Sequence, residues 1–202
     1  MKACQIGAIL LAVASFVSFT AQAGDAEAGK AKSAVCAACH GVDGNSVNPT
    51  WPSLAGQHET YLYKQLVDFK EERRVDASMA GMVANLSDED MKDLSAYFAS
   101  QTPKAVPFDG NLIATGESIY RGGITETRVA ACMGCHSPTG TGNGPAGWPS
   151  LAGQHPEYII AQLQAFKHGK RNNDTGKMMQ NVAVRMSDEE MASVAAYIAG
   201  IQ

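Results

Sequence analysis

The residues of this chain best suited to chemistry fall in two short stretches that share one pattern. Cys36-Ala37-Ala38-Cys39-His40 and Cys132-Met133-Gly134-Cys135-His136 both have the form Cys-x-x-Cys-His. This pattern is typical of c-type haem attachment, in which two thiols form thioethers with the haem vinyl groups and the adjacent imidazole reaches the iron. A single copy would also suit a zinc pair or a redox dithiol. Two copies predict two covalently bound haems.

The remaining cysteine supports this interpretation. The sequence contains five cysteines, and the fifth, Cys4, lies in a segment with the pattern of a cleavable export signal. Lys2 is followed by an apolar run over 6–19, and the small residues of 21–23 suit signal peptidase. We expect residues 1–23 to be removed and the protein to be periplasmic. Every cysteine of the mature chain then belongs to an attachment motif, as an oxidising compartment favours.

Both motifs lie in a unit that the chain repeats. Residues 51–58, Trp-Pro-Ser-Leu-Ala-Gly-Gln-His, recur unchanged at 148–155, and 87–91 recur with one change at 187–191. A repeat of this length indicates a duplicated domain. We therefore expect a first domain over 24–104, a linker over 105–111 that is preceded by one proline and contains another, and a second domain over 112–202.

Each copy has the pattern of helices. Leu62, Leu66 and Phe69 are spaced as one apolar stripe, and Ser87 with Asp90 matches a helix-capping box. No run of alternating apolar and polar residues suggests a strand. The sequence therefore predicts an all-α protein. The second copy also has extra residues near 121–129, outside the shared framework.

The second axial ligand of each iron must come from elsewhere in the unit. When the copies are aligned on their capping serines, Met79 and Met179 coincide, each eight residues before its serine. We predict these two methionines as iron ligands. His58 and His155 are also shared and are the alternative, and bis-histidine ligation would give a lower reduction potential.

Together these features resemble the cytochrome c4 family. The residues that carry the resemblance are the paired Cys-x-x-Cys-His motifs, the repeated Pro-Ser-Leu-Ala-Gly-Gln segment, the methionine before Leu-Ser-Asp or Met-Ser-Asp, and the Ala-Tyr helices near the end of each copy. The resemblance covers essentially the whole mature chain. It implies two tandem class I cytochrome c-like domains, each wrapping one covalent haem, with the haems facing each other across the interface.

The resemblance also implies roles for residues around the haems. The carbonyls of Pro52 and Pro149 are expected to accept the Nδ1–H of the haem histidines. Two glycines should let the first helix of each domain cross the last one, and two arginines are expected to pair with the haem propionates. These residues are Gly29, Gly116, Arg74 and Arg171.

His/Met ligation fills both axial positions of each iron, which leaves no open site for a substrate. The net charge of −4 disfavours a nucleic-acid-binding surface. The sequence thus predicts an electron carrier, soluble or peripherally bound to a membrane. Its expected partners are redox proteins, namely a respiratory donor complex and a terminal oxidase. Two alternatives stay open: the di-haem subunit of a larger oxidoreductase, such as a flavin-dependent sulfide dehydrogenase, and a haem enzyme.

Overall fold

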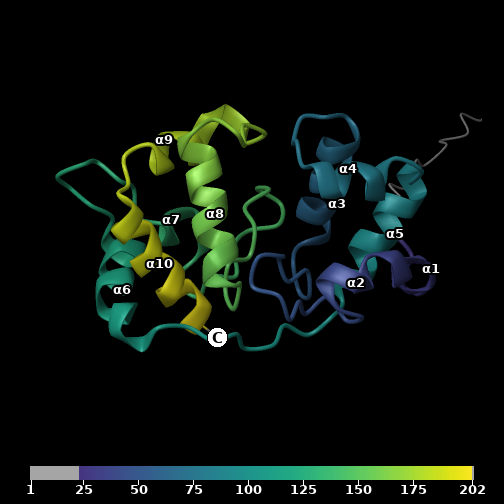
Figure 1. Cartoon of the computed structure of the whole chain (residues 1–202), viewed down its shortest axis with the longest axis horizontal. Coiled ribbons are helices and arrows are strands. Elements are labelled where there is room, and N and C mark those ends of the chain that lie inside the picture. The colour runs from purple at the N-terminus through teal and green to yellow at the C-terminus, as the bar shows by residue number, and fades with distance from the viewer. Residues whose placement is uncertain (1–22, 202) are drawn as a thin grey trace, which may run out of the picture.

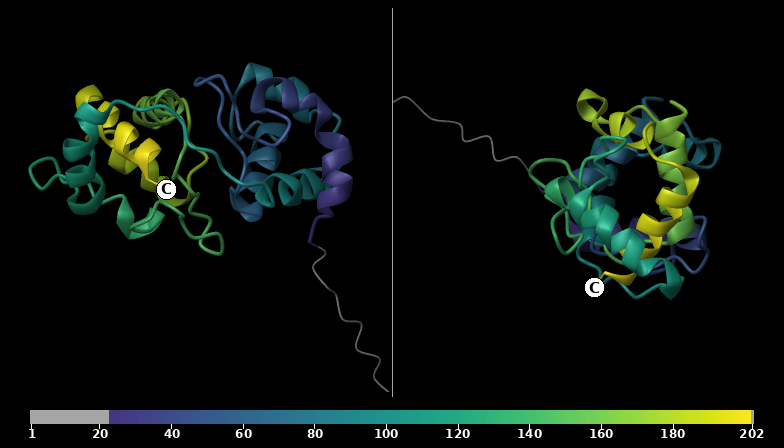
Figure 2. Two further views of the ribbon diagram at one scale, coloured as in Figure 1. Left: turned by 90° about the horizontal axis from the view of Figure 1, so that it is seen from below. Right: turned by 90° about the vertical axis from the view of Figure 1, so that its left-hand side faces the viewer.

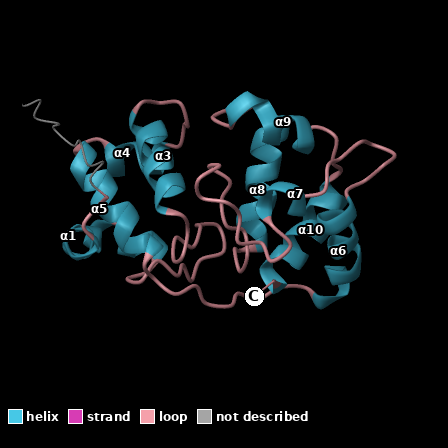
Figure 3. Ribbon diagram, turned by 180° about the vertical axis from the view of Figure 1, so that it is seen from behind, coloured by secondary structure: helices cyan, strands magenta, loops and turns pink. Residues whose placement is uncertain are grey.

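The computed structural model describes residues 23–201, so the expected export signal lies outside the described residues apart from Ala23. Within this range the chain forms helices and loops and no strand (Figure 3). Two isolated antiparallel bridges, Ile124–Val129 and Asn143–Trp148, are the closest approach to sheet structure there. No helix of 23–201 combines the length and the apolar character needed to cross a bilayer. The predicted all-α class is confirmed.

The described chain divides into two lobes that repeat one order of helices (Figure 1). The first lobe contains α1 Ala26–Lys32, η1 Ser33–Val35, α2 Ala37–His40, α3 Glu59–Lys70, α4 Ala77–Val83 and α5 Asp88–Ala99. The second contains η2 Gly110–Leu112, α6 Ile113–Gly122, α7 Met133–His136, α8 Pro156–Lys167, η3 Thr175–Lys177, α9 Met178–Ala183 and α10 Asp188–Gly200. The sequence repeat is therefore a repeat of structure, with α6 to α10 in the places of α1 to α5.

A stretch without helix, residues 100–109, connects the lobes and runs along one side of both (Figure 2). The expected linker at 105–111 overlaps the end of this stretch. The domain boundaries at 104 and 112 stay a prediction. The stretch without helix begins before residue 104 and continues after it, so no helix end marks that boundary.

In each lobe the first and last helices cross at a glycine. An added Cβ on Gly29 would lie 2.0 Å from the carbonyl oxygen of Asp93, and one on Gly116 would lie 2.0 Å from that of Ser193. Any side chain at these positions would push the helices apart. The last helices begin where the sequence predicts, because Ser87 and Ser187 each form a complete capping box.

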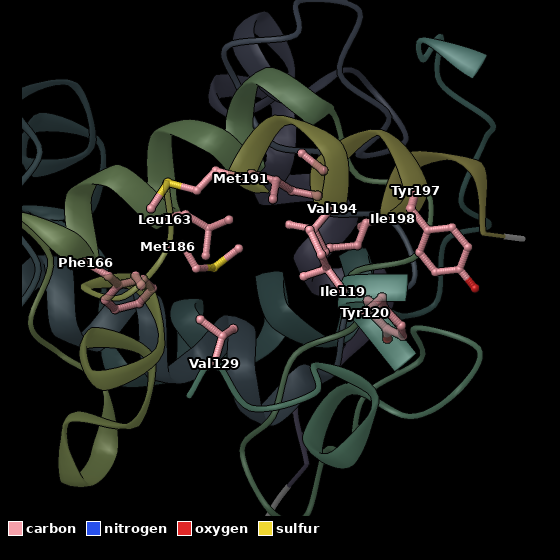
Figure 4. Close-up of a cluster of buried hydrophobic side chains, with 13 residues drawn as sticks. Ile119, Tyr120, Val129, Leu163, Phe166, Met186, Met191, Val194, Tyr197 and Ile198 are labelled. Carbon is pink, nitrogen blue, oxygen red and sulfur yellow. The ribbon is translucent and has the colours of Figure 1, made fainter. Parts of the chain in front are cut away.

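The apolar core of the second lobe lies between α6, α8 and α10 (Figure 4). Met191, in α10, is fully buried there, and Met91 is buried at the equivalent place in the first lobe. Both methionines therefore serve packing, as the helical stripe indicates. A cavity lies against the cores of both lobes, and residues of both attachment motifs line it.

Candidate cofactor sites

The spacing of each attachment motif is that of one helical turn. The amide of His40 donates to the carbonyl oxygen of Cys36 at 3.0 Å, and that of His136 donates to Cys132 at 2.9 Å. The first thiol and the imidazole of each motif therefore lie one turn apart, at the ends of α2 and α7. All four described cysteines are free of disulfides. The local geometry is thus ready for two thioethers and one iron ligand.

A backbone carbonyl orients each imidazole. Nδ1 of His40 donates to the carbonyl oxygen of Pro52 at 2.8 Å, and Nδ1 of His136 donates to that of Pro149 at 2.9 Å. This bond places the proton on Nδ1 and leaves the lone pair of Nε2 for a metal. Burial lowers the pKa of both histidines, although the bond to the proline carbonyl opposes the shift. The shift favours the neutral ring, which is the form that binds a metal.

One continuous cavity of about 620 Å³ lies against both motifs. Helix α3 supplies part of its apolar wall through Leu62, Leu66 and Phe69, the stripe that the sequence predicts. Cys132 packs against the core of the second lobe and is not part of the cavity wall. The proposed ligand residues that line the cavity come from both lobes: Cys36, Cys39, His40, Met79, Cys135, His136 and Met179.

The two rival histidines have a different role. Nε2 of His58 donates to the carbonyl oxygen of Thr141 at 2.8 Å, and Nε2 of His155 donates to that of Ser46 at 2.9 Å. Each bond crosses from one lobe to the other, and neither histidine is part of the cavity wall. Each ring is held in a contact between the lobes and outside the cavity wall, which disfavours the bis-histidine alternative.

Zinc and dithiol chemistry fit the motifs poorly. Within the described residues no group of three or more His, Cys, Asp and Glu side chains comes together as a metal site. Burial raises the pKa of the Cys36 thiol, and it raises the pKa of Cys132 to about 11. Reactive and metal-binding cysteines have lowered pKa values instead. The Cys36 and Cys132 thiols therefore lack the lowered pKa that the zinc and dithiol alternatives favour.

Two arginines in the cavity wall bear on whether haem fits the cavity. Arg74 and Arg171 line the cavity, and only 8% of Arg171 is exposed. Neither guanidinium forms an ion pair with a carboxylate of the described residues. Asp76 and Asp174 also line the cavity, but neither lies within ion-pair distance of these guanidinium groups. A buried cation without a direct counter-ion is costly, so the arginines favour an anionic group beside them. The carboxylates of haem propionates supply that charge, and the residues present therefore fit haem.

The same arginines also join the lobes, a role that the sequence did not indicate. Arg74 donates to Tyr158 at 3.0 Å and to Gln162 at 2.9 Å. Arg171 makes the equivalent contacts to Tyr61 at 2.8 Å and Gln65 at 3.3 Å. These partners lie on α3 and α8, the helices on the facing sides of the lobes (Figure 1). The interface thus has approximate two-fold symmetry.

The repeated eight-residue segment contributes a second symmetric pair of contacts. Gln57 exchanges two hydrogen bonds with the backbone of Ser150, at 2.8 and 2.9 Å. Gln154 exchanges two with the backbone of Ser53, both at 2.9 Å. Each copy of the segment therefore docks on the other copy. This explains why the glutamine is present in both.

One part of the interface breaks the symmetry. Asp68 is only 2% exposed and accepts hydrogen bonds from Lys64 and Arg73 of its own lobe and, at 2.6 Å, from Asn173 of the other. Burial alone would raise the pKa of this carboxyl, but the bonds from Lys64, Asn173 and Arg73 hold it below its ordinary value. The second copy has Ala165 in the equivalent place. The buried carboxylate therefore belongs to the first lobe alone.

Comparisons with known proteins agree with this geometry. The family model for cytochrome c matches residues 26–102 and 115–202. Cytochrome c4 of Pseudomonas aeruginosa is 49% identical over 180 residues, which cover 89% of this chain and 90% of that protein. The crystal structure of reduced recombinant cytochrome c4 from Pseudomonas stutzeri matches with a TM-score of 0.86 and 45% identity, over 89% of this chain and 100% of that one.

A further relative has a name that refers to a redox partner. The thiosulfate dehydrogenase electron acceptor of Stutzerimonas stutzeri (strain A1501) is 36% identical over 170 residues, covering 82% of this chain and 78% of that protein. The similarity to all three proteins extends over both lobes.

Proposed function

We propose a function from the premise that this chain belongs to the cytochrome c4 family, whose members are di-haem electron carriers rather than enzymes. The chain accepts electrons from a respiratory donor in the periplasm and delivers them to a terminal oxidase. The observation that carries this proposal is the single cavity bordered by both Cys-x-x-Cys-His motifs. The periplasmic location rests on the export signal expected at 1–23.

Specific residues hold the two c-type haems in this proposal. Each haem supplies a one-electron iron couple when it is bound. The thiols of each motif would fix the group covalently, and the imidazole would bind iron through Nε2, because its Nδ1–H is held by the proline carbonyl. A methionine sulfur of the cavity wall would be the second protein ligand of each iron. The first set is Cys36, Cys39, His40 and Met79, with Pro52 behind the histidine; the second is Cys132, Cys135, His136 and Met179, with Pro149.

Two strong protein ligands on each iron leave no position for a substrate molecule, and this favours electron transfer over substrate chemistry. The docked lobes support a relay. Glutamines, histidines and arginines cross the interface in symmetric pairs, so the two sites are held in one relative position. Preorganised polar groups of this kind need little rearrangement when charge moves between the sites.

The test mixes reduced holoprotein with a terminal oxidase, and separately with peroxide or thiosulfate. We expect the oxidase to oxidise the protein fast, at a rate that falls as salt is added. Salt screens the contacts between charged partner proteins. We expect the small molecules to give no repeated turnover. Turnover with peroxide or thiosulfate would indicate an enzyme, and stable co-purification with a flavoprotein would indicate a subunit of a larger oxidoreductase.

The name of one relative, the thiosulfate dehydrogenase electron acceptor, suggests a second electron donor for this chain. In this variant of the proposal the chain receives electrons from a thiosulfate-oxidising enzyme before passing them on. Oxidised holoprotein should then be reduced by thiosulfate when a thiosulfate dehydrogenase is present and stay oxidised with thiosulfate alone. Equal rates with and without the dehydrogenase would exclude the chain as its acceptor.

A further inference from the structure

The turn directly after the haem histidine differs between the two lobes. In the first lobe this position is Gly41, with φ 79° and ψ 156°. In the second lobe Ser137 takes nearly the same conformation, with φ 67° and ψ 160°. This region of backbone space is essentially restricted to glycine, because a Cβ is strained there. The second lobe therefore holds a side-chain-bearing residue in a conformation that it would not adopt by itself.

In the second lobe a tyrosine of the first helix bonds to this turn, at a position where the first lobe has no tyrosine. Tyr120 is completely buried in α6, four residues after the crossing glycine Gly116. The equivalent residue in the first lobe, four after Gly29, is Ser33. The hydroxyl of Tyr120 donates to the carbonyl oxygen of Ser137 at 2.7 Å and lies 3.4 Å from that of His136. The tyrosine and the strained serine thus occur together.

The aromatic core fixes the position of this hydroxyl. The rings of Tyr120 and Tyr197 are 5.4 Å apart in a tilted arrangement, and Tyr197 packs where α6 and α10 cross (Figure 4). A local polar contact also stabilises the turn, since the amide of Thr141 donates to the Ser137 hydroxyl at 3.0 Å. The bond from Tyr120 is the contact that ties the turn to the helical core.

The turn at Ser137 positions two groups that orient the His136 imidazole: the peptide that follows His136 and the carbonyl of Pro149. It fixes the peptide that follows His136, and it starts the loop that ends at Pro149, whose carbonyl accepts the imidazole Nδ1–H. Within that loop the amide of Gly142 donates back to the carbonyl oxygen of His136 at 2.8 Å. If Ser137 relaxed, the histidine and its carbonyl partner would both move.

We infer that the Tyr120 hydroxyl is a positioning group for the second haem: it holds Ser137 in the glycine-like turn and thereby sets the orientation of His136. This inference rests on the proposed role of His136 as an iron ligand. The first lobe has glycine at position 41 and ties its turn to the core differently, because the hydroxyl of Tyr97 on α5 donates to the carbonyl oxygen of Val42 at 2.8 Å.

The test compares Tyr120→Phe with Tyr197→Phe, which removes a hydroxyl from the same aromatic pair without touching Ser137. Amide hydrogen exchange at Gly142 reports opening of the turn whether or not His136 binds iron. Because the Gly140 amide still donates to Ser137 at 3.2 Å, Tyr120→Phe removes about one net hydrogen bond, and we expect exchange about fivefold faster. Tyr197→Phe should leave the rate unchanged.

The link to the haem is tested on the same oxidised holoproteins. Tyr120→Phe should shift the hyperfine-shifted haem methyl signals and the reduction potential of one haem and leave the other haem unchanged. In a Ser137→Gly background the same substitution should have less than half of these effects, because glycine adopts the turn unaided. Unchanged methyl signals and potentials, or equal effects in both backgrounds, would overturn the positioning role. Failure of the proposed function would appear differently, as a parent protein lacking His/Met-ligated haem.

Discussion

The guanidinium of Arg171 in the second lobe donates a hydrogen bond of 2.8 Å to the hydroxyl oxygen of Tyr61 in the first. Arg171 also lies over the ring of its own Phe166, 4.5 Å from the centroid. Arg74 has the same arrangement, over Phe69 at 4.6 Å and bonded to Tyr158. Each arginine is therefore clamped between an aromatic ring of its own lobe and a hydroxyl of the other. The cavity for the two cofactors and the interface between the lobes share these residues.

Removing the hydroxyl of Tyr61 should loosen the docking of the lobes. Tyr61→Phe takes a hydrogen bond from a buried cation, and we expect a loss of about 2 kcal/mol in the free energy of unfolding. Denaturant titration of the holoprotein measures this loss. Tyr63→Phe is the control, because its hydroxyl bonds to Asp88 at an exposed position and should contribute less than about 0.5 kcal/mol. Equal losses in the two variants would contradict the assigned role of the arginine.

Acid should weaken the interface through Asp68. The pKa of this carboxyl is lowered in the folded protein, so its ionised form stabilises the fold above its ordinary pKa of about 3.9. That stabilisation is lost as the pH falls through the lower folded value. We expect Asp68→Asn to cost about 2 kcal/mol at pH 7 and progressively less in acid, as measured by denaturation at several pH values. A cost that does not change with pH would show that the charge of Asp68 contributes nothing.

The helix crossing at Gly116 should tolerate no side chain. Gly116→Ala places a Cβ 2.0 Å from the Ser193 carbonyl oxygen, and we expect a loss of about 3 kcal/mol or failure of the second lobe to form. Gly134→Ala is the matched control, because nothing lies within 4 Å of its added Cβ and the first motif has Ala38 there. Thermal unfolding compares the two. A stable Gly116→Ala variant would mean that the helices can separate without penalty.

The repeat in the sequence accounts for much of this description. The thiols and histidines of the attachment motifs act within one helical turn, so their geometry follows from local spacing. Met79 and Met179 are proposed as iron ligands only because the chain contains two copies that can be aligned. That alignment also pairs His58 with His155, but it cannot show which surface the two rings contact.

Contacts between the copies are beyond what such an alignment reveals. The bond from His58 to Thr141 and that from Gln57 to Ser150 join residues far apart in the chain. They depend on how two finished lobes pack together, and no local pattern reports this. Ser137 shows the same limit in another way, because a serine gives no sign in the sequence of a glycine-like backbone.

The ligand assignment predicts the effect of changing each methionine. Sulfur bound to ferric haem iron gives a weak near-infrared charge-transfer band, and the parent protein should show this band from two sites. Met79→Leu and Met179→Leu should each remove about half of the intensity, and the double variant all of it. Met91→Leu, a core substitution of similar volume, should leave the band unchanged and cost less than about 1.5 kcal/mol. Loss of the band in His58→Ala instead would favour bis-histidine ligation.

The central claim, a carrier with two haems that are each closed by two protein ligands, is tested most directly by a reductive titration under carbon monoxide. Electron equivalents are added to the oxidised holoprotein at neutral pH while its haem spectrum is recorded with and without the gas. We predict uptake of two electrons per chain and identical spectra in the two conditions, because each iron lacks an open position. A carbon monoxide adduct at either haem, or uptake of a single electron, would contradict the account.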